Sequence, residues 1–335
     1  MDWQVIWFVL IAVLFVGFFF LEGFDYGVGI LLPFVARTDT ERRILINTIG
    51  PVWDGNEVWM ITAGGALFAA FPHVYATLFS GFYFALFLLL LALIVRGVAF
   101  EFRSKDESKR WRASWDWLIF FGSFTPALLW GVVVTNLIQG LPIDARMQYT
   151  GTFFDLLSPY ALVGGAAFLL VFTFHGGLFL TLKVESEALI AAVRRAALRI
   201  GALAAVCFAL LGALTYARTD LFESAVAAVC LIAAAAAFVL GWLAARGRRY
   251  GRGFALSSAA IVLTTIAFFA GLFPRLMVSS LRPEWSLTIH NASSTPYTLS
   301  IMTLAAVFVV PLVLGYQGWT YWVFRKRVSA KHLEY

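Results

Sequence analysis

Four carboxylates lie in or beside long apolar stretches of the chain. They are Glu22, Asp25, Asp54 and Glu57. Glu22 and Asp25 are three residues apart, as are Asp54 and Glu57, so on helices each pair would share one face. If these stretches cross a membrane, each charge costs about 2.5–3.5 kcal/mol at bilayer depth. The pattern therefore indicates a route for protons or cations, and the alternative is a set of structural acids that are neutral, paired with arginine or placed at helix N-termini.

Small residues near the acids indicate close helix packing. Gly23 and Gly27 form a GxxxG pattern, and Gly64 and Gly65 follow in the second apolar stretch. Pro51 is typical of the first turn of a helix. We therefore expect the second apolar helix to begin there, close to the end of the first, so that all four acids lie at one depth.

Three further side chains lie near the acids or at the same depth. Arg96, at the end of the third apolar stretch, is the expected countercharge, and the alternative is that it extends to the inner headgroups. Trp53 and Trp59 flank Asp54. The sequence leaves open whether they are interfacial anchors or walls of an internal cavity.

The composition is that of a polytopic membrane protein. The 335 residues are 61% hydrophobic and 13% charged, whereas a soluble domain is about 25% charged. The apolar runs do not alternate with polar residues, which excludes a β-barrel. We expect one all-α integral domain over residues 1–335 with nine spans. The predicted spans are residues 5–35, 50–72, 74–100, 115–139, 159–182, 199–217, 222–245, 253–273 and 298–323.

Basic residues predict the orientation. Of the 25 Lys and Arg, 20 lie in the connections after spans one, three, five and seven or in the C-terminal segment. Such residues stay on the cytoplasmic side, so we expect the N-terminus outside and the C-terminus inside. No basic residue precedes Arg37, so the first stretch is predicted to be a retained span. The net charge of +6 favours membrane lipid as a partner and gives no support for nucleic acid.

The chain lacks the usual patterns of metal and nucleotide sites. There is no Walker, Rossmann or HExxH motif. His175 is the one histidine inside a predicted span, and a lone histidine is more typical of a hydrogen-bonded packing residue. Cys207 and Cys230 each lie in a span without a CxxC partner, which predicts two packed thiols. We expect this chain to ligate no metal or haem, so any catalytic electrons would pass through another subunit.

Long strings of the sequence resemble one family. LEGFDYGVGILLPFV, DTERRILINTIGPVWDGNEVWMITAGGALFAAFP and SLTIHNASSTPYTLSIMT are similar to subunit II of the cytochrome bd-type quinol oxidases, including their cyanide-insensitive branch. The resemblance covers most of the chain and is densest over residues 20–130.

The resemblance implies a partner and a reaction. It implies a heterodimer with subunit I in the bacterial cytoplasmic membrane, each subunit having two four-helix bundles and one peripheral helix. Subunit I would carry the haems, two b-type and one d-type or a b-type variant. The complex would oxidise quinol and reduce dioxygen to water with cytoplasmic protons. Some members hold a structural quinone in subunit II, and small single-span accessory subunits are left open.

Roles for individual acids come only from the resemblance. Asp54 matches an aspartate on a proton route to the haems at the subunit interface. Glu22 and Asp25 match acidic positions in the first span. Glu57 departs from the family pattern, because some relatives have Gln there, and this weakens its case as an obligatory proton carrier.

The resemblance also bears on the other named residues. Trp59 matches a tryptophan associated with an oxygen path, and Arg96 matches the basic residue that ends the third span. With Trp53, they are candidates for an oxygen path or the subunit interface. The rival interpretation is a proton-coupled secondary transporter, which would favour broken helices and paired repeats. A third, a pure assembly subunit, would tolerate neutralisation of all four acids.

Overall fold

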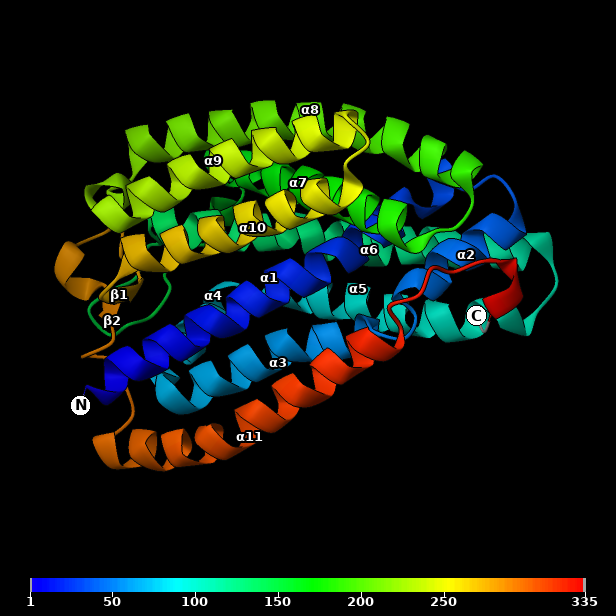
Figure 1. Cartoon of the computed structure of the whole chain (residues 1–335). Coiled ribbons are helices and arrows are strands. Elements are labelled where there is room, and N and C mark those ends of the chain that lie inside the picture. The colour runs from blue at the N-terminus through cyan, green and yellow to red at the C-terminus, as the bar shows by residue number, and fades with distance from the viewer. Residues whose placement is uncertain (1, 334–335) are drawn as a thin grey trace.

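The computed structural model describes residues 2–333 as a bundle of long helices with a small β-sheet at one end (Figure 1). The helices are α1 Trp3–Val35, α2 Asp39–Ile49, α3 Trp53–Ala70, α4 Pro72–Gly81, α5 Tyr83–Phe102, α6 Lys109–Gln139, α7 Pro159–Lys183, α8 Glu187–Arg218, α9 Ala225–Arg246, α10 Tyr250–Leu272 and α11 Pro296–Val323. Short 3-10 helices lie at Arg103–Lys105, Phe153–Leu156, Leu221–Glu223, Pro283–Trp285 and Ala330–His332. The strands are β1 Arg275–Met277 and β2 Leu287–Thr288, which pair antiparallel.

Within residues 2–333, eight helices are long and apolar enough to span a membrane. They are α1 and α5 to α11, so the helical membrane class predicted from the sequence is confirmed. The helix α3, which matches the predicted second span, is not among them, and the predicted count of nine is not established. The physical reason is the polar start of α3, which carries Asp54, Asn56 and Glu57 in its first five residues.

The predicted third span, residues 74–100, is wrong as one continuous helix. The chain leaves the helical conformation at Phe82, between α4 and α5. Before the break, Gly81 lies against the ring of Tyr149, where an added Cβ would come within 2.9 Å of the ring. The outer loop that follows α6 therefore packs closely against the last residue of α4.

The start of the second apolar helix also differs from the prediction. Pro51 lies in the turn before α3, which begins at Trp53. The preceding segment forms α2, which the sequence analysis did not anticipate. Its N-terminus has a capping box, in which Thr38 and Glu41 satisfy each other's backbone N–H groups. This short amphipathic helix leads the chain back into the bundle.

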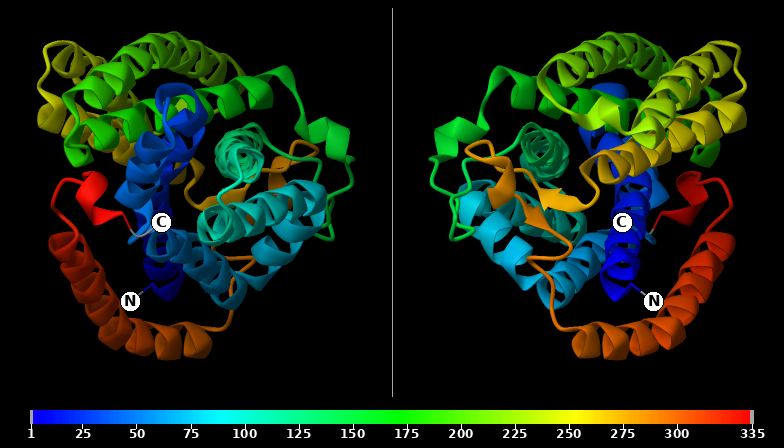
Figure 2. Two further views of the ribbon diagram at one scale, coloured as in Figure 1. Left: turned by 90° about the vertical axis from the view of Figure 1, so that its right-hand side faces the viewer. Right: turned by 90° about the vertical axis from the view of Figure 1, so that its left-hand side faces the viewer.

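Helix α1 lies in the middle of the bundle and packs against α3, α6, α7 and α10 (Figure 2). Close packing at the predicted GxxxG pattern is confirmed. An added Cβ on Gly27 would overlap the carbonyl oxygen of Phe172 and lie 2.8 Å from the Cα of Gly176 on α7. By contrast, no described atom lies within 4 Å of a Cβ added at Gly64 or Gly65. The α1–α7 crossing therefore depends on glycine, and the Gly64-Gly65 pair does not pack helices within this chain.

Helix α11 lies along the outside of the bundle (Figures 1 and 2). Leu299 is its one buried residue. The connection before it contains the β1–β2 pair. After α11 the chain turns back, and the N–H of Val328 donates to the carbonyl of Lys183 at 2.7 Å.

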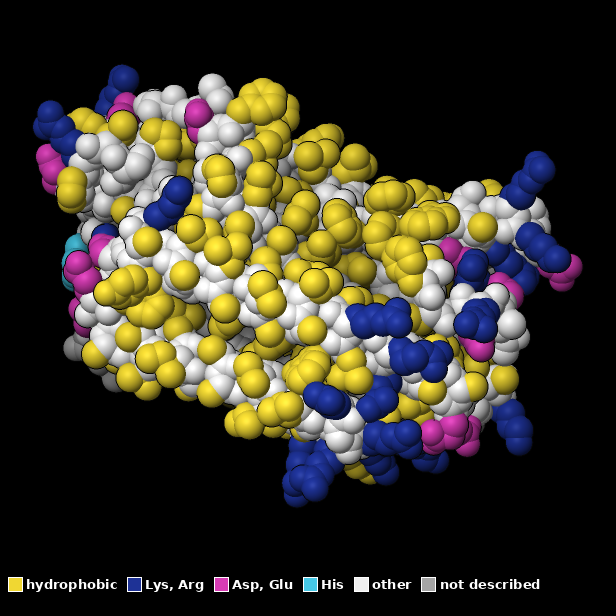
Figure 3. All heavy atoms as spheres, turned by 90° about the horizontal axis from the view of Figure 1, so that it is seen from above, with side chains coloured by type: hydrophobic (Ala, Val, Ile, Leu, Met, Phe, Trp, Pro, Cys, Tyr) yellow, Lys and Arg dark blue, Asp and Glu magenta, His cyan; other side chains and the backbone are white. Residues whose placement is uncertain are grey.

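Lys and Arg side chains gather toward one end of the molecule, beyond a broad apolar band (Figure 3). That end holds the connections between α1 and α3, α5 and α6, α7 and α8, and α9 and α10. The β1–β2 sheet lies at the opposite end (Figure 1). The apolar band matches the surface that a bilayer would contact.

Candidate functional site

The central group of the site is the guanidinium of Arg96, which α5 carries into the core. Its Nη1 donates to Glu22 on α1 and, at 3.2 Å, to Glu57 on α3. The guanidinium carbon lies 4.9 Å from the centre of the Tyr26 ring. Neither the Arg96 nor the Glu22 side chain is exposed. The prediction that Arg96 is the countercharge of the acids is confirmed, and the alternative that it extends to the headgroups is wrong.

Asp25 is the second fully buried acid, and an amide holds it. The Nδ2 of Asn56 donates to Asp25 Oδ2 at 2.6 Å, and neither residue is exposed. Asn56 was not among the predicted site residues, although it lies in the same WDGNE motif as two of the acids. An amide within an otherwise apolar helix needs a hydrogen-bond partner when it is buried, and this signal could have identified it.

Asp54 lies apart from the other three acids. Its side chain is exposed and makes no hydrogen bond or ion pair with any residue that the structure describes. The buried part of the site therefore consists of Glu22, Asp25 and Glu57 around Arg96. The four predicted acids share one region of the bundle, but Asp54 is on the outer face of α3.

A hydrogen-bonded group from α11 completes the site. Trp59 Nε1 donates to Gln317 Oε1 at 2.7 Å, and Gln317 Nε2 donates to Asn56 Oδ1 at 3.1 Å. The hydroxyl of Tyr321 donates to the same Asn56 oxygen at 2.8 Å. Gln317 and Tyr321 were not among the predicted site residues. The available signal was Gln317 itself, an isolated amide within an apolar helix.

Among the described residues, the buried site holds more carboxyl groups than cationic groups. Three carboxyl groups face one guanidinium, which stays charged at all ordinary pH values. Glu22 Oε2 and Asp25 Oδ1 are buried and have no hydrogen-bond partner among the described residues. Acids that can gain or lose protons beside one fixed positive charge form an arrangement suited to proton transfer.

The two tryptophans are packed between helices. The centre of the Trp53 ring lies 5.2 Å from the centre of the Phe100 ring on α5. The ring of Trp59 packs against Gly17 of α1, so closely that no Cβ would fit there. Neither tryptophan lines the two cavities described next. Both are half-buried.

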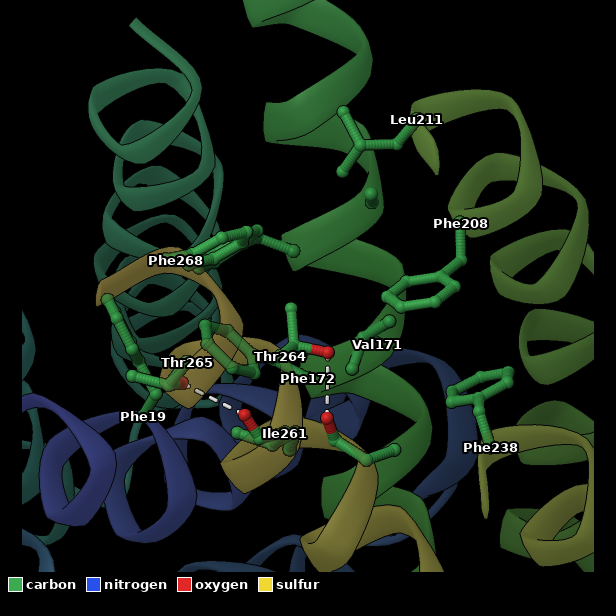
Figure 4. Close-up of a pocket in the computed structure, with 13 residues that line it drawn as sticks. Phe19, Val171, Phe172, Phe208, Leu211, Phe238, Ile261, Thr264, Thr265 and Phe268 are labelled. Carbon is green, nitrogen blue, oxygen red and sulfur yellow. Dashed lines mark hydrogen bonds between the residues drawn. The ribbon is translucent and has the colours of Figure 1, made fainter. Parts of the chain in front are cut away.

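Two apolar cavities lie between helices of the bundle, and each is partly open to the surface. The larger has a volume of about 670 Å³ and is bounded by α1, α3 to α6 and α10, with Phe8, Phe15, Met60 and Trp130 among its walls. The smaller, about 40 Å³, lies among Phe208, Leu211, Phe238 and Phe268 (Figure 4). The hydroxyls that face it, of Thr264 and Thr265, are hydrogen-bonded to carbonyls of their own helix. Both cavities therefore suit apolar molecules.

His175 does not offer a free nitrogen to a haem iron. Its Nδ1 lies 2.7 Å from Ser257 Oγ and its Nε2 lies 3.3 Å from the carbonyl oxygen of Phe20. The ring stacks on Phe254 at 4.6 Å. The prediction of a hydrogen-bonded packing histidine is confirmed. Cys207 and Cys230 are free thiols, and in the described part of the chain no group of three or more His, Cys, Asp or Glu is placed to hold a metal ion.

A second network of ion pairs lies between the acid site and the basic end. Arg103 donates to Asp116 at 2.6 Å and to Asp39 at 2.8 Å. Arg42 and Arg112 donate to Asp116 and Asp39 from the other side. Burial alone would raise the pKa of Asp39, but the hydrogen bond and charge of Arg103 and the charge of Arg112 hold it below its ordinary value. This network ties α2 to α6 and to the short 3-10 helix that follows α5.

Comparison with known sequences gives a consistent result over nearly the whole chain. The family profile described as cytochrome bd terminal oxidase subunit II matches residues 3–324. The chain is 45% identical over 330 residues to the cytochrome bd ubiquinol oxidase subunit 2 of Bacillus subtilis (strain 168), with 97% of each chain covered. It is 39% identical over 370 residues to the cytochrome bd-I ubiquinol oxidase subunit 2 of Escherichia coli (strain K12), covering 98% of this chain and 96% of that one.

Comparison with solved structures supports the fold. A chain of the bd oxidase from Geobacillus thermodenitrificans matches with a TM-score of 0.76 at 18% identity, covering 97% of this chain and 99% of that one. At that identity the likeness speaks for the fold alone. The family profile and the two close relatives also identify the family. The chain belongs to the cytochrome bd terminal oxidase subunit II family.

Proposed function

We propose that this chain delivers protons from the basic side of the membrane to a haem-bearing subunit I, and that it helps to hold that subunit in place. As a member of its family, the chain is a component of an oxygen-reducing quinol oxidase of the respiratory chain. Reduction of dioxygen to water consumes protons as well as electrons. Electrons would pass through the haems of subunit I, and protons through acids such as those described above.

The observation that carries this proposal is the buried group of Glu22, Asp25 and Glu57 around Arg96. Burying several carboxyl groups beside one guanidinium is energetically costly. Ionisable groups that are kept within membrane helices at such a cost are typical of proton routes. The site lies in the half of α1 nearer the basic end. Its acids are therefore placed between the basic face and the middle of the membrane.

The outer face of α3 is the surface we assign to subunit I. Asp54 is exposed there, on the same helix as Val58 and Ile61, which are 45% and 65% exposed. A carboxylate facing lipid would cost about 2.5–3.5 kcal/mol. A partner protein covering this face would remove that cost and would receive protons from Asp54 directly. The resemblance to the family favours subunit I as the protein that covers this face.

The same argument assigns α3 as the ninth span. Its low hydropathy comes from the polar residues of its first turn, and these would be covered by protein in the complex. The eight apolar helices and α3 then make two four-helix bundles with α11 as the peripheral helix, as the family resemblance implies. With nine spans the two termini lie on opposite sides, and the basic end would be cytoplasmic.

The larger cavity is our candidate for a structural quinone and for dioxygen access. Its volume of about 670 Å³ is in the range that holds a small organic molecule. Its walls are almost entirely apolar side chains, which suit an isoprenoid tail or a dissolved gas. Met60 on its wall adjoins Trp59, the residue that the family resemblance links with an oxygen path.

Two other functions are less well supported. The family membership does not favour a proton-coupled transporter. A pure assembly subunit remains the alternative, and it predicts that the acids can be neutralised without loss of turnover.

The test is Asp54→Asn in the assembled complex, with haem content and quinol oxidase turnover measured together. Glu187→Gln is the matched control, because Glu187 is an exposed acid outside the site. We expect normal haem and a fall in turnover of about tenfold or more, equal to about 1.4 kcal/mol in the barrier. Normal haem with normal turnover would contradict a proton role for Asp54, and loss of haem would indicate a structural role.

A further inference from the structure

We propose that Trp59, Gln317 and Asn56 form a one-way chain of hydrogen-bond donors that ends on Asp25 and shifts its protonation equilibrium toward the charged carboxylate. The three are positioning residues, acting through Asp25, and α11 supplies the middle link. This inference deepens the proposed function and rests on it for its biological use. Its physical content, the charge state of Asp25, can be measured separately.

The direction of the chain is set at Trp59. An indole N–H can only donate a hydrogen bond. Since Trp59 Nε1 lies 2.7 Å from Gln317, the atom that faces it must be the amide oxygen Oε1. The amide nitrogen of Gln317 must then face the other way, toward Asn56 Oδ1 at 3.1 Å.

Asn56 passes the direction on to Asp25. Its Oδ1 accepts from both Gln317 Nε2 and the hydroxyl of Tyr321. A flipped Asn56 amide would set its N–H groups against the Gln317 amide N–H and its oxygen against the carboxylate. Its Nδ2 is therefore fixed on Asp25 Oδ2, at 2.6 Å. Two donors on one amide oxygen also polarise the amide and strengthen its own donated bond.

The position of α11 makes this arrangement rigid. Gln317 and Tyr321 are four residues apart and share one face, and both are half-buried although the residues around them are mostly exposed. Trp7 donates to the carbonyl oxygen of Leu299 near the start of α11. Lys183 donates to the carbonyl oxygen of Phe324 at its end. The helix is thus fastened at both ends, and its inward polar face is held against Asn56.

The chain cannot itself carry the proton. Its links are indole and amide N–H groups, which do not release protons under ordinary conditions. Its effect is electrostatic, because a donated hydrogen bond favours the charged carboxylate over the neutral acid. The other oxygen, Asp25 Oδ1, is buried and has no partner among the described residues. That oxygen is where a proton would bind and leave.

The experiment measures the protonation of Asp25 in the purified complex by infrared spectroscopy. The C=O stretch of a protonated carboxylic acid is assigned to Asp25 by its absence in Asp25→Asn. Gln317→Met removes the middle link at similar size, and Asn56→Leu removes the direct donor. Thr320→Val is the control on the same helix, because the Thr320 hydroxyl bonds only to its own backbone. Haem content and yield are recorded for each variant.

We expect the ratio of protonated to charged Asp25 to rise about fivefold in Asn56→Leu, as for the loss of one hydrogen bond. Gln317→Met should change it in the same direction by less, with normal haem, and Thr320→Val should match the wild type. An unchanged Asp25 band in folded Gln317→Met and Asn56→Leu would overturn the inference. If the band rises but turnover and its pH profile do not change, the donor chain stands and the proton route through Asp25 fails.

Discussion

Arg96 donates a hydrogen bond to Glu22 in the middle of the bundle, and neither side chain is exposed. One residue comes from α5 and the other from α1, so the pair joins two helices that are far apart in sequence. The same guanidinium also contacts Glu57 of α3. The fold therefore depends on the charge at the centre of the proposed proton site, and function and stability are coupled there.

Arg96→Met should destabilise the complex strongly. It leaves buried carboxylates without a countercharge, and breaking a buried pair from one side costs about 3–5 kcal/mol. Thermal unfolding of the purified complex measures the loss. Arg110→Met, which changes an exposed arginine, should have little effect. Adding Glu22→Gln to Arg96→Met should recover part of the stability, and no recovery would show that Glu22 is not the residue left unpaired.

Gly27→Ala should weaken the crossing of α1 and α7. The new Cβ would overlap the backbone of Phe172 and approach Gly176. Overpacking of this kind costs about 1–3 kcal/mol. The yield and thermal stability of the complex report it. Gly212→Ala is the matched control, because no described atom lies within 4 Å of its added Cβ. Equal stability of the two variants would contradict the described crossing.

The ion pairs of Asp39 should give a stability that depends on pH. Its pKa is lower in the folded chain than its ordinary value, so the pairs stabilise the fold above that ordinary value, about 3.9. The contribution is lost as the pH falls through the lowered pKa. Asp39→Asn should therefore be less stable than the wild type at about pH 7, and the difference should vanish at strongly acidic pH. A difference that is constant with pH would show that the charge of Asp39 is not responsible.

Filling the larger cavity should displace the structural quinone that we propose for it. Gly64 lines this cavity, and Gly64→Leu would place a branched side chain in it. We expect the variant complex to retain its haem and to carry less co-purified quinone, measured by solvent extraction. Gly212→Leu, outside the cavity, is the control. Unchanged quinone in Gly64→Leu would exclude this cavity as the quinone site in this chain.

Much of the helical framework could be predicted because lipid imposes a simple rule on sequence. Apolar runs gave most helix limits within a few residues, as at α7 and α10. The break at Phe82 was missed because the residues on both sides are equally apolar, and Tyr149, which packs against Gly81 beside the break, lies in a distant loop. Helix α2 was missed because it is polar, although Thr38 and Glu41 carry its capping signal.

The site was predictable where charge was involved. A buried charged acid needs a cation nearby, and Arg96 was the one basic residue predicted at the depth of the acids. The contact between Arg96 and the acids could therefore be predicted. An isolated amide in an apolar helix marks a candidate residue but does not indicate its partner. Gln317 lies 261 residues from Asn56, and nothing in either local sequence indicates that they meet. The exposure of Asp54 also could not be foreseen, because it depends on how α3 is rotated against α1 and α5.

The central claim is that protons reach the haem subunit through the acids of this chain. The most direct measurement is the rate of proton uptake from solution during a single reaction of the reduced complex with dioxygen, followed with a pH-indicator dye. In Asp25→Asn with normal haem content, we predict that proton uptake slows by about tenfold or more, equal to about 1.4 kcal/mol in the barrier. Uptake at the wild-type rate in that variant would contradict the claim.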